Sequence, residues 1–374
     1  MAAKSFDVIV IGVGVVGAAA AYHLAQRGQR VLALEQFELD HQMGSSYGES
    51  RIIRYAYKDA VYVDMAKEVF PMWHTLEQQI GKRLLTPSGG LDFGPADYWS
   101  LLDTRDNLAA AGIVHEWMTP AEVAQRFPQF HLDEGMMGLY QPDAASMNAS
   151  ACVRALVEIA QQHGAILKTQ SPVTKIEPLA ASVRVYTAEG EYSAGQVVIT
   201  AGAWAGKLLQ SLDLNLPLTP TRQEQVFFEP ADRHAFAAGT FPVFIYHNEP
   251  WYYGLPDMGK GLKVAIHNLT VPTDPDNTTR AKDEAIIETV RAWTKHFIPA
   301  AGNSPICETR VCLYTMTPDE HFLIDKHPAY PNVVIGSPCS GHGFKFGILT
   351  GRIVADLAQG QALAHDMFSV RRFL

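Results

Sequence analysis

The sequence predicts an α/β (α+β) protein in which a mostly parallel, helix-covered sheet carries an inserted domain built on an antiparallel sheet. Three observations support this prediction. A strand, a glycine-rich turn, a helix and a second strand follow one another within residues 6–35, and similar strand and glycine-turn units recur in the middle and at the end of the chain. Residues 217–311 are instead rich in aromatic residues, prolines and short alternating runs. The first pattern is typical of a βαβ unit and the last of antiparallel strands.

The first unit begins with a largely β-branched run at 6–11. Such a run is typical of a parallel strand buried on both faces. Residues 15–27 are predicted to form a helix whose alanines allow close packing on the sheet, and Gly28 ends it. Residues 30–34 predict the second strand, which places Glu35 at its carboxyl end.

Two further passages repeat parts of this plan. The middle passage predicts a helix at 151–163 and strands at 165–167, 182–186 and 196–202. The last passage predicts a strand at 332–336, a glycine turn at 340–344 and a helix at 347–359.

The chain has 374 residues, which at roughly 150 residues per domain favours two domains. It shows no repeat and no low-complexity linker, so we expect the second domain to be threaded through the first. The expected nucleotide-binding domain comprises residues 1–85, 145–215 and 320–374. The expected substrate and catalytic domain comprises residues 86–144 and 216–319.

Composition and charge exclude several classes of partner. Lys and Arg number 30 against 39 Asp and Glu, so the net charge of −9 argues against nucleic acid or an anionic membrane. The longest apolar stretch, residues 8–22, is shorter than the roughly 20 residues that a spanning helix needs. The 4 cysteines form no C-x-x-C pair, which favours a reducing compartment and hence the cytoplasm. The 14 histidines show no ligand spacing that predicts a metal site.

Gly12, Gly14 and Gly17 match the G-x-G-x-x-G pattern between the first strand and the first helix. Their roles would be a tight turn, close approach of the backbone to a pyrophosphate, and close packing of the helix on the strand. Glu35 stands 18 residues after Gly17, where a carboxylate can accept hydrogen bonds from a ribose diol. The loop therefore predicts a dinucleotide site and disfavours NADP, but it does not distinguish FAD from NAD.

Several motifs together resemble one family of enzymes. They are the opening IGVGVVGAAAAYHLAQRGQRVLALE, GSSYGESRIIRYAY at 44–57, YYG at 252–254, GLKVAIH at 261–267, CLYTMTPDEHFLIDKHP at 312–328 and CSGHGFKF at 339–346. In these segments the chain resembles the monomeric sarcosine oxidase and N-methyl-L-tryptophan oxidase family, a group of FAD-dependent amine oxidoreductases. The resemblance runs from residue 6 to about residue 360.

The resemblance implies a fold, a cofactor and a reaction. It implies an FAD-binding Rossmann-like domain of the glutathione-reductase type. The implied reaction is oxidation of an N-methylated, sarcosine-like secondary amino acid, with hydride transfer to FAD and then reduction of dioxygen to hydrogen peroxide. It also implies a monomer. Oxidation of cyclic or other N-substituted amino acids, such as proline, pipecolate or glycated amino acids, stays open, as do an NAD-dependent dehydrogenase and a flavoprotein that binds FAD for stability alone.

The role of Cys312 has two interpretations. From the surrounding apolar residues alone it would be a buried structural thiol. The resemblance implies instead that its sulfur is bonded to the 8α carbon of FAD, which requires a thiolate. Members of the family carry two consecutive histidines where this chain has Ser46 and Tyr47.

Basic residues supply the other candidate site. From sequence alone Arg51 and Arg54 would share a face of a helical turn, and a lysine at position 263 in an alternating strand usually points to solvent. The resemblance implies that Arg54 and Lys345 bind the substrate carboxylate, that Arg51 lies near the isoalloxazine ring, and that Lys263 activates dioxygen.

The remaining implied site residues shape the pocket or contact the cofactor. His267 and Tyr253, which could equally be core residues, would shape the substrate pocket and influence protonation of the amine. The expected cofactor-binding positions are Gly12, Gly14, Gly17, Glu35, Ser50, Arg51, Val173, Cys312, Gly341, His342, Gly343 and Lys345.

Overall fold

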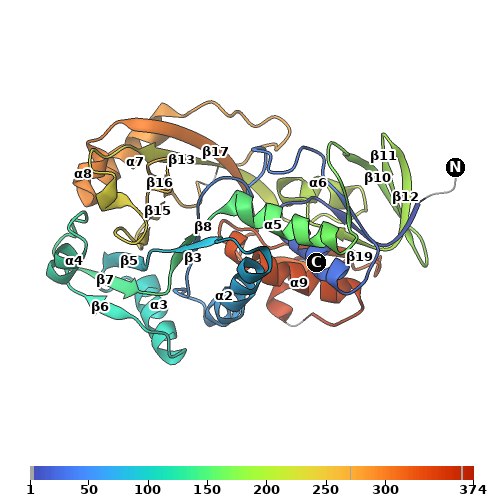
Figure 1. The fold of residues 1–374 in the computed structure, drawn as a ribbon, viewed down its shortest axis with the longest axis horizontal. Coiled ribbons are helices and arrows are strands. Elements are labelled where there is room, and N and C mark those ends of the chain that lie inside the picture. Colours follow the sequence, from blue (N-terminus) through green and yellow to red (C-terminus); the bar gives the residue numbers. More distant parts are fainter. Residues whose placement is uncertain (1–3, 270, 364) are drawn as a thin grey trace.

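The computed structural model describes residues 4–269, 271–363 and 365–374. Two eight-stranded sheets lie toward opposite ends of the long axis of the molecule, and a small three-stranded sheet lies between them (Figure 1). Within the described ranges, no helix combines the length and the apolar character needed to cross a membrane.

The first large sheet has the strand order β10-β11-β12-β1-β2-β9, with β19 paired to β12 and β18 paired to β19. Its parallel members pair in register at their carboxyl ends, with Ile11 opposite both Leu34 and Ile199, and Ile199 opposite Ile335. The loops that follow these strands therefore meet at one edge, where ligands of open α/β sheets bind. The strands are β1 (Lys4–Ile11), β2 (Val31–Leu34), β9 (Ile166–Lys168), β10 (Val173–Pro178), β11 (Val183–Thr187), β12 (Gly190–Ile199), β18 (Leu323–Lys326) and β19 (Val333–Ser337).

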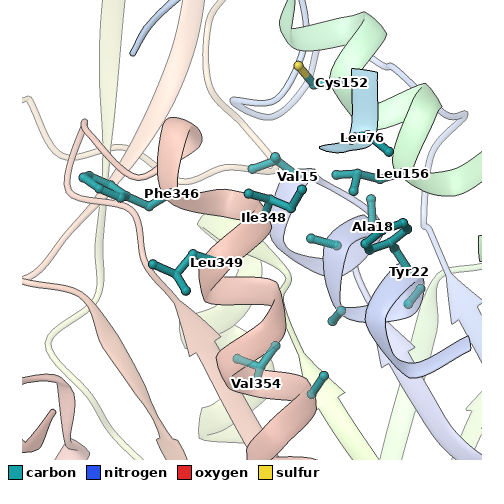
Figure 2. Packing of buried hydrophobic residues seen from close by; sticks show 14 of the residues in the cluster. Val15, Ala18, Tyr22, Leu76, Cys152, Leu156, Phe346, Ile348, Leu349 and Val354 are labelled. Carbon is teal, nitrogen blue, oxygen red and sulfur yellow. The ribbon is translucent and has the colours of Figure 1, made fainter. Parts of the chain in front are cut away.

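Helices α1 (Val15–Gln26), α5 (Ala149–Gln162) and α9 (Gly347–Ala358) pack together with α2 (Ala60–Ile80) over this sheet. Figure 2 shows Val15, Ala18 and Tyr22 of α1 facing side chains of the other helices. The helices approach closely because small residues meet, and a Cβ added to Gly351 would lie 2.3 Å from the Ala19 Cβ. The predicted α/β architecture of this part is confirmed, with helix ends within one or two residues of the predicted ones.

The second large sheet has the order β17-β13-β16-β15-β14-β5-β7-β6. It is antiparallel except for β14 and β5, which pair in parallel where the two stretches of the chain that form the sheet meet. Its aromatic core packs beneath α7 (Glu284–Phe297), where Trp293 stacks on Tyr252 with ring centroids 4.4 Å apart. The strands are β5 (Gly90–Pro95), β6 (Glu116–Met118), β7 (Met136–Gln141), β13 (Thr219–Phe228), β14 (Val243–Tyr246), β15 (Tyr252–Leu255), β16 (Leu262–Ile266) and β17 (Ile306–Met316).

The three-stranded sheet joins the two large ones. It consists of β3 (Arg51–Ile53), β8 (Ala145–Met147) and β4 (Leu85–Pro87), in that order. The other helices are α3 (Trp99–Ala110), α4 (Pro120–Arg126), α6 (Ala205–Gln210) and α8 (Pro299–Gly302), with short 3-10 turns at Gly202–Trp204, His234–Phe236, Phe344–Phe346, Asp366–Phe368 and Val370–Phe373.

Candidate active site

The glycine-rich loop connects β1 to α1 at the carboxyl edge of the first sheet. Gly12 has φ +89°, a conformation that a residue with a side chain rarely adopts. A Cβ added to Gly17 would lie only 1.9 Å from the Gly12 carbonyl oxygen. The start of α1 faces a cavity whose lining includes Gly12, Gly14 and Val15, so its free N–H groups and partial positive charge are available to an anionic ligand.

The same first cavity reaches the end of β2 and the loops beyond it. Glu35 is buried there, and its carboxylate accepts hydrogen bonds from the Val13 N–H at 2.8 Å and the Phe37 N–H at 3.1 Å. Val173 also lines this cavity, as does Ser337, whose buried hydroxyl has no hydrogen-bond partner among the described residues. An unpartnered buried hydroxyl fits a polar ligand in the cavity.

A second cavity lies beside the first and shares with it the lining residues Ser45, Cys339, Gly343 and Phe344. It brings together residues that are distant in sequence, on β3, β15, β16, β17 and the turn before α9. The predicted site residues that line it are Arg51, Arg54, Tyr253, Lys263, His267, Cys312, Gly341, His342, Gly343 and Lys345. Ser50 does not line it through its side chain, but its carbonyl oxygen accepts a hydrogen bond from Lys263 Nζ at 2.8 Å.

Arg51 and Arg54 are not on a helical turn, so that expectation was wrong. Arg51 begins β3, and Arg54 follows its last residue. The segment is extended because β3 pairs with β8, a strand almost a hundred residues away, and no local pattern reveals that pairing. Arg51 donates to the carbonyl oxygens of Ser45 and Ser50, whereas Arg54 donates to Asp92.

Lys263 points inward, so the solvent-facing alternative was wrong as well. Its side chain is 2% exposed, and burial together with the charge of Arg51 holds the pKa of the amine well below its ordinary value. Burial and the charge of Arg54 do the same to the pKa of Lys345. These two lysines and two arginines make the cavity strongly electropositive.

Tyr57 contacts both of the cations that the family resemblance assigns to carboxylate binding. Lys345 Nζ donates to the Tyr57 hydroxyl at 2.7 Å, and the Arg54 guanidinium lies 4.9 Å from the centroid of the Tyr57 ring. Lys345 also donates to the His342 carbonyl oxygen at 3.2 Å. The arrangement holds the two positive groups on one side of the cavity, where they can bind an anion together.

Tyr253 lies on β15 and His267 directly follows the neighbouring strand β16, with the two ring centroids 6.4 Å apart. Burial, with the charges of Lys345 and Arg54, lowers the pKa of His267 to about 4. Burial raises the pKa of Tyr253 to about 12. At neutral pH the imidazole is therefore uncharged and the phenol keeps its proton.

Comparison with known proteins identifies the family. Residues 7–357 match the DAO family, described as FAD dependent oxidoreductase. The chain belongs to this family. Monomeric sarcosine oxidase of Bacillus sp. (strain NS-129) is 35% identical, with 98% of this chain and 97% of that protein covered. N-methyl-L-tryptophan oxidase of Yersinia pestis (strain Pestoides F) is 32% identical, with 98% and 99% covered.

Solved structures agree with this assignment. The open form of NikD, an unusual amino acid oxidase essential for nikkomycin biosynthesis, has a TM-score of 0.86 and 27% identity, with 97% of this chain and 96% of that chain covered. Membership of the FAD dependent oxidoreductases decides for FAD over NAD, which the glycine-rich loop alone leaves open. The alternative of an NAD-dependent dehydrogenase was therefore wrong.

The residues of this FAD dependent oxidoreductase fit its cofactor. In the first cavity, the start of α1, the Glu35 carboxylate and the unpartnered Ser337 hydroxyl suit the phosphates and the ribose of a dinucleotide. In the second, His342 Nδ1 is buried without a hydrogen-bond partner among the described residues. Because the two cavities meet, one ligand can extend from the glycine-rich loop to the electropositive pocket.

Cys312 is buried in this oxidoreductase, and burial raises the pKa of its thiol, an effect that the nearby charges of Arg51 and Lys263 oppose. Gln225 Nε2 lies 3.4 Å from the sulfur as a hydrogen-bond donor. Sequence reasoning missed Gln225, because the polar run Arg222 to Gln225 gives no local signal that this side chain is buried.

Sequence reasoning also missed Tyr57, Asp92 and His247. Asp92 stands between Leu91 and Phe93 in a strand buried on both faces, and a carboxylate at such a position indicates an internal partner. Across the described part of the oxidoreductase, no three His, Cys, Asp or Glu side chains are placed to hold a metal ion together.

Proposed function

We propose that this FAD-dependent protein is an oxidase of N-methylated secondary amino acids of the sarcosine type. It converts the substrate to an imine, which hydrolyses to an aldehyde and an amine, and it produces hydrogen peroxide. The observation that carries this proposal is the placement of Arg54 and Lys345 on Tyr57, inside a cavity that joins the dinucleotide cavity. The names of the relatives, sarcosine oxidase and N-methyl-L-tryptophan oxidase, support the same class of substrate.

The chain's own residues bind and orient the substrate. Arg54 and Lys345 hold the carboxylate, and a carboxylate held by two donors keeps the rest of a small amino acid in one orientation. When bound, FAD supplies a two-electron acceptor for the amine and passes the electrons to dioxygen. Lys345 is buried, and an electrostatic contact is stronger in such surroundings than in water.

His267 and Tyr253 influence the protonation of the amine. Amine oxidation needs an unprotonated nitrogen, whose lone pair develops into the iminium ion. The uncharged imidazole of His267 can accept a hydrogen bond from the amine. The nearby cations disfavour protonation of this imidazole. A protonated phenol can donate to the nitrogen lone pair or to the carboxylate. Neither residue has to act as an essential base.

We further propose roles for Cys312, Lys263 and Arg51. Cys312 holds FAD covalently at the 8α carbon of the flavin. This role is supported by the position of Cys312, which is buried and lines the second cavity. Lys263 promotes the reduction of dioxygen, because a fixed positive group stabilises the superoxide anion that forms first. Arg51 stabilises negative charge on the reduced cofactor, and its own position is supported by hydrogen bonds to two backbone carbonyls.

We also propose the division into an FAD-binding domain (residues 1–85, 145–215 and 320–374) and a substrate domain (residues 86–144 and 216–319). All strands of the first large sheet fall in the former and all strands of the second in the latter, which supports it. A cytoplasmic monomer is the proposed working form, and the four free cysteines support a reducing compartment.

A panel of amines tests the proposed reaction. Sarcosine, N-methyl-L-tryptophan, L-proline, pipecolate and a glycated amino acid are supplied separately, and peroxide release and anaerobic bleaching of the flavin are recorded. We expect the N-methylated amino acids to give the highest kcat/KM. A higher kcat/KM for L-proline or pipecolate would overturn the N-methylated class in favour of cyclic amino acids. If no amine bleaches the flavin, FAD serves stability alone.

A further inference from the structure

Asp92 is a buried carboxylate directly behind the electropositive cavity. It lies on β5, its side chain is 2% exposed, and its Oδ1 accepts hydrogen bonds from Arg54 Nη1 at 2.6 Å and from His247 Nε2 at 2.8 Å. Arg54 and His247 line the cavity, whereas Asp92 contacts it only through them. The arginine assigned to the substrate carboxylate thus already has a carboxylate partner within the protein.

His247 does not add a positive charge to this cluster. The ionised carboxylate of Asp92 can only accept, so His247 Nε2 carries the hydrogen, and Nδ1, 3.2 Å from the Ser100 hydroxyl, accepts from it. Burial lowers the pKa of His247, although Asp92 opposes this, and the imidazole is neutral at neutral pH. Ser100, His247 and Asp92 have the connectivity of a hydrolytic triad, but Asp92 is already paired with Arg54.

At this end of the cavity Arg54 is thus already paired with a carboxylate, and Lys345 is the cation beside that pair. Arg54 carries one positive charge, Asp92 one negative charge, and Asp92 is the anion whose field acts on the Lys345 amine. Arg54 Nε and Nη2 make no hydrogen bond to another residue in the described ranges. These free donors can receive a second carboxylate beside Asp92, from a ligand.

We propose that Asp92 is an internal counter-ion that competes with the ligand carboxylate for Arg54 and thereby selects substrates with one carboxylate over amino dicarboxylates. The inference rests on the proposed function, in which Arg54 and Lys345 hold the substrate carboxylate. One carboxylate finds Lys345 and the free donors of Arg54. A second carboxylate at this end of the cavity is repelled by Asp92. The other cations of the lining are Arg51 and Lys263, which the proposed function assigns to the cofactor and dioxygen, and Lys58, which is paired with Asp59. Specificity arises from this repulsion against the wrong ligand.

Two thioethers provide a matched pair of probes for the holoenzyme. Methylthioacetate has the shape of N-methylglycine with sulfur in place of nitrogen, and thiodiacetate carries a second carboxylate. Neither has an amine that can be oxidised or protonated, so their Kd values, measured from the change in flavin absorbance, report carboxylate binding alone. We expect the unsubstituted protein to bind methylthioacetate more tightly than thiodiacetate.

Asp92→Asn should tighten the binding of both probes, because the ligand then replaces the missing counter-ion of Arg54. We expect thiodiacetate to gain about tenfold more than methylthioacetate, so that the selectivity falls. Asp97→Asn is the matched control: it makes the same change of charge at an exposed position just after β5 that lines neither cavity, and it should leave both Kd values unchanged.

The melting temperature gives a second readout. Without a probe, Asp92→Asn should melt at a lower temperature than the unsubstituted protein, because Arg54 has lost its buried partner. Methylthioacetate should raise the melting temperature of Asp92→Asn by more than it raises that of the unsubstituted protein. If this variant does not fold, the comparison moves to Arg54→Gln with and without Asp92→Asn. The double variant has no unpaired charge at either position, and it should also show reduced selectivity for methylthioacetate over thiodiacetate.

Three outcomes decide against the inference. If Asp92→Asn weakens both probes by the same factor, Asp92 only positions Arg54. If the selectivity is unchanged in both backgrounds, Asp92 does not exclude the dicarboxylate. If Arg54→Gln leaves the Kd of methylthioacetate unchanged, the carboxylate site itself is elsewhere, which overturns that part of the proposed function together with the inference. The first two outcomes leave the proposed function intact.

Discussion

Gln225 Nε2 donates a hydrogen bond to Cys312 Sγ over 3.4 Å, across the antiparallel pair β13 and β17. The Gln225 side chain is 5% exposed and the Cys312 side chain 2%. A buried N–H donor stabilises a thiolate relative to a thiol, and so do the charges of Arg51 and Lys263. Because the proposed covalent attachment of FAD requires the thiolate, this contact bears directly on that proposal.

We expect Gln225→Leu to lower the fraction of covalently bound flavin at least several-fold, because burial then acts on the Cys312 thiol with less opposition. The intact mass of the denatured protein and the fluorescence of its band on a denaturing gel measure that fraction. Cys312→Ser should abolish attachment, whereas Cys339→Ser, which changes another cavity cysteine, should preserve it. Full attachment in Gln225→Leu would show that the glutamine is dispensable.

The second expectation concerns Lys263, whose Nζ is held by the Ser50 carbonyl oxygen. Lys263→Met should slow reoxidation of the reduced flavin by a factor of about 100 or more and leave its reduction by substrate nearly unchanged, because superoxide forms only in the oxidative step and Arg51 is assigned to the negative charge of the reduced flavin. Stopped-flow absorbance measures both half-reactions. Lys260→Met, at an exposed position nearby, is the control. Equal losses in both half-reactions would contradict the assignment.

The sequence predicted those parts of the fold that local patterns encode. The run before Gly12 and the small residues of α1 specify a strand and a helix by themselves, and both occur as predicted. The segment from Arg51 to Arg54 was misread because its extended form depends on β8, which no local pattern reveals. Long-range pairing overrides short-range spacing at such places.

The same limit applies to the site. Lys263 could be assigned to the cavity only by resemblance, since its alternating strand fits solvent exposure equally well, and the carbonyl oxygen that Lys263 contacts belongs to Ser50, 213 positions away. Asp92 and His247 are 155 positions apart and meet only because β5 and β14 pair in parallel. The contacts of Asp92 with His247 and Arg54 are therefore a property of the assembled sheets, and no spacing in the sequence could have predicted them.

A third expectation concerns the glycine-rich loop. Gly17→Ala places a Cβ 1.9 Å from the Gly12 carbonyl oxygen and 2.6 Å from Thr200 Oγ1, so the loop has to move. We expect this variant to lose most of its FAD. Its free energy of unfolding should be lower than that of the unsubstituted protein by about 2 kcal/mol or more.

The flavin absorbance of the purified protein and its urea unfolding curve check this expectation. Gly206→Ala is the matched control, because its added Cβ would meet its nearest neighbour, the Leu218 carbonyl oxygen, at an ordinary 3.7 Å. A Gly17→Ala protein with full flavin content and unchanged stability would show that the loop is not the dinucleotide site.

The last expectation follows from His23, which is half-buried where α1 packs on α9, with its Nε2 3.0 Å from the Ile348 carbonyl oxygen. Burial, with smaller effects of Arg27 and Arg352, lowers its pKa from 6.5 to about 4 in the folded protein. Below pH 6.5 the unfolded chain binds a proton that the folded protein does not, so the free energy of unfolding falls as the pH falls toward 4. For this one residue the loss between pH 7.5 and pH 5 amounts to about 2 kcal/mol.

His23→Gln keeps a side-chain donor near Ile348 but cannot be protonated, so its unfolding free energy should fall by about 2 kcal/mol less over that range. Urea unfolding at pH 7.5 and pH 5 measures the difference, and the exposed His163→Gln provides the comparison, with an acid response like that of the unsubstituted protein. An identical acid response in His23→Gln would mean that His23 is protonated in the folded protein at pH 5. In that case the interface between α1 and α9 tolerates the charge, and acid sensitivity originates in other groups, among them the cavity histidines His247, His267 and His342, whose pKa values burial also lowers.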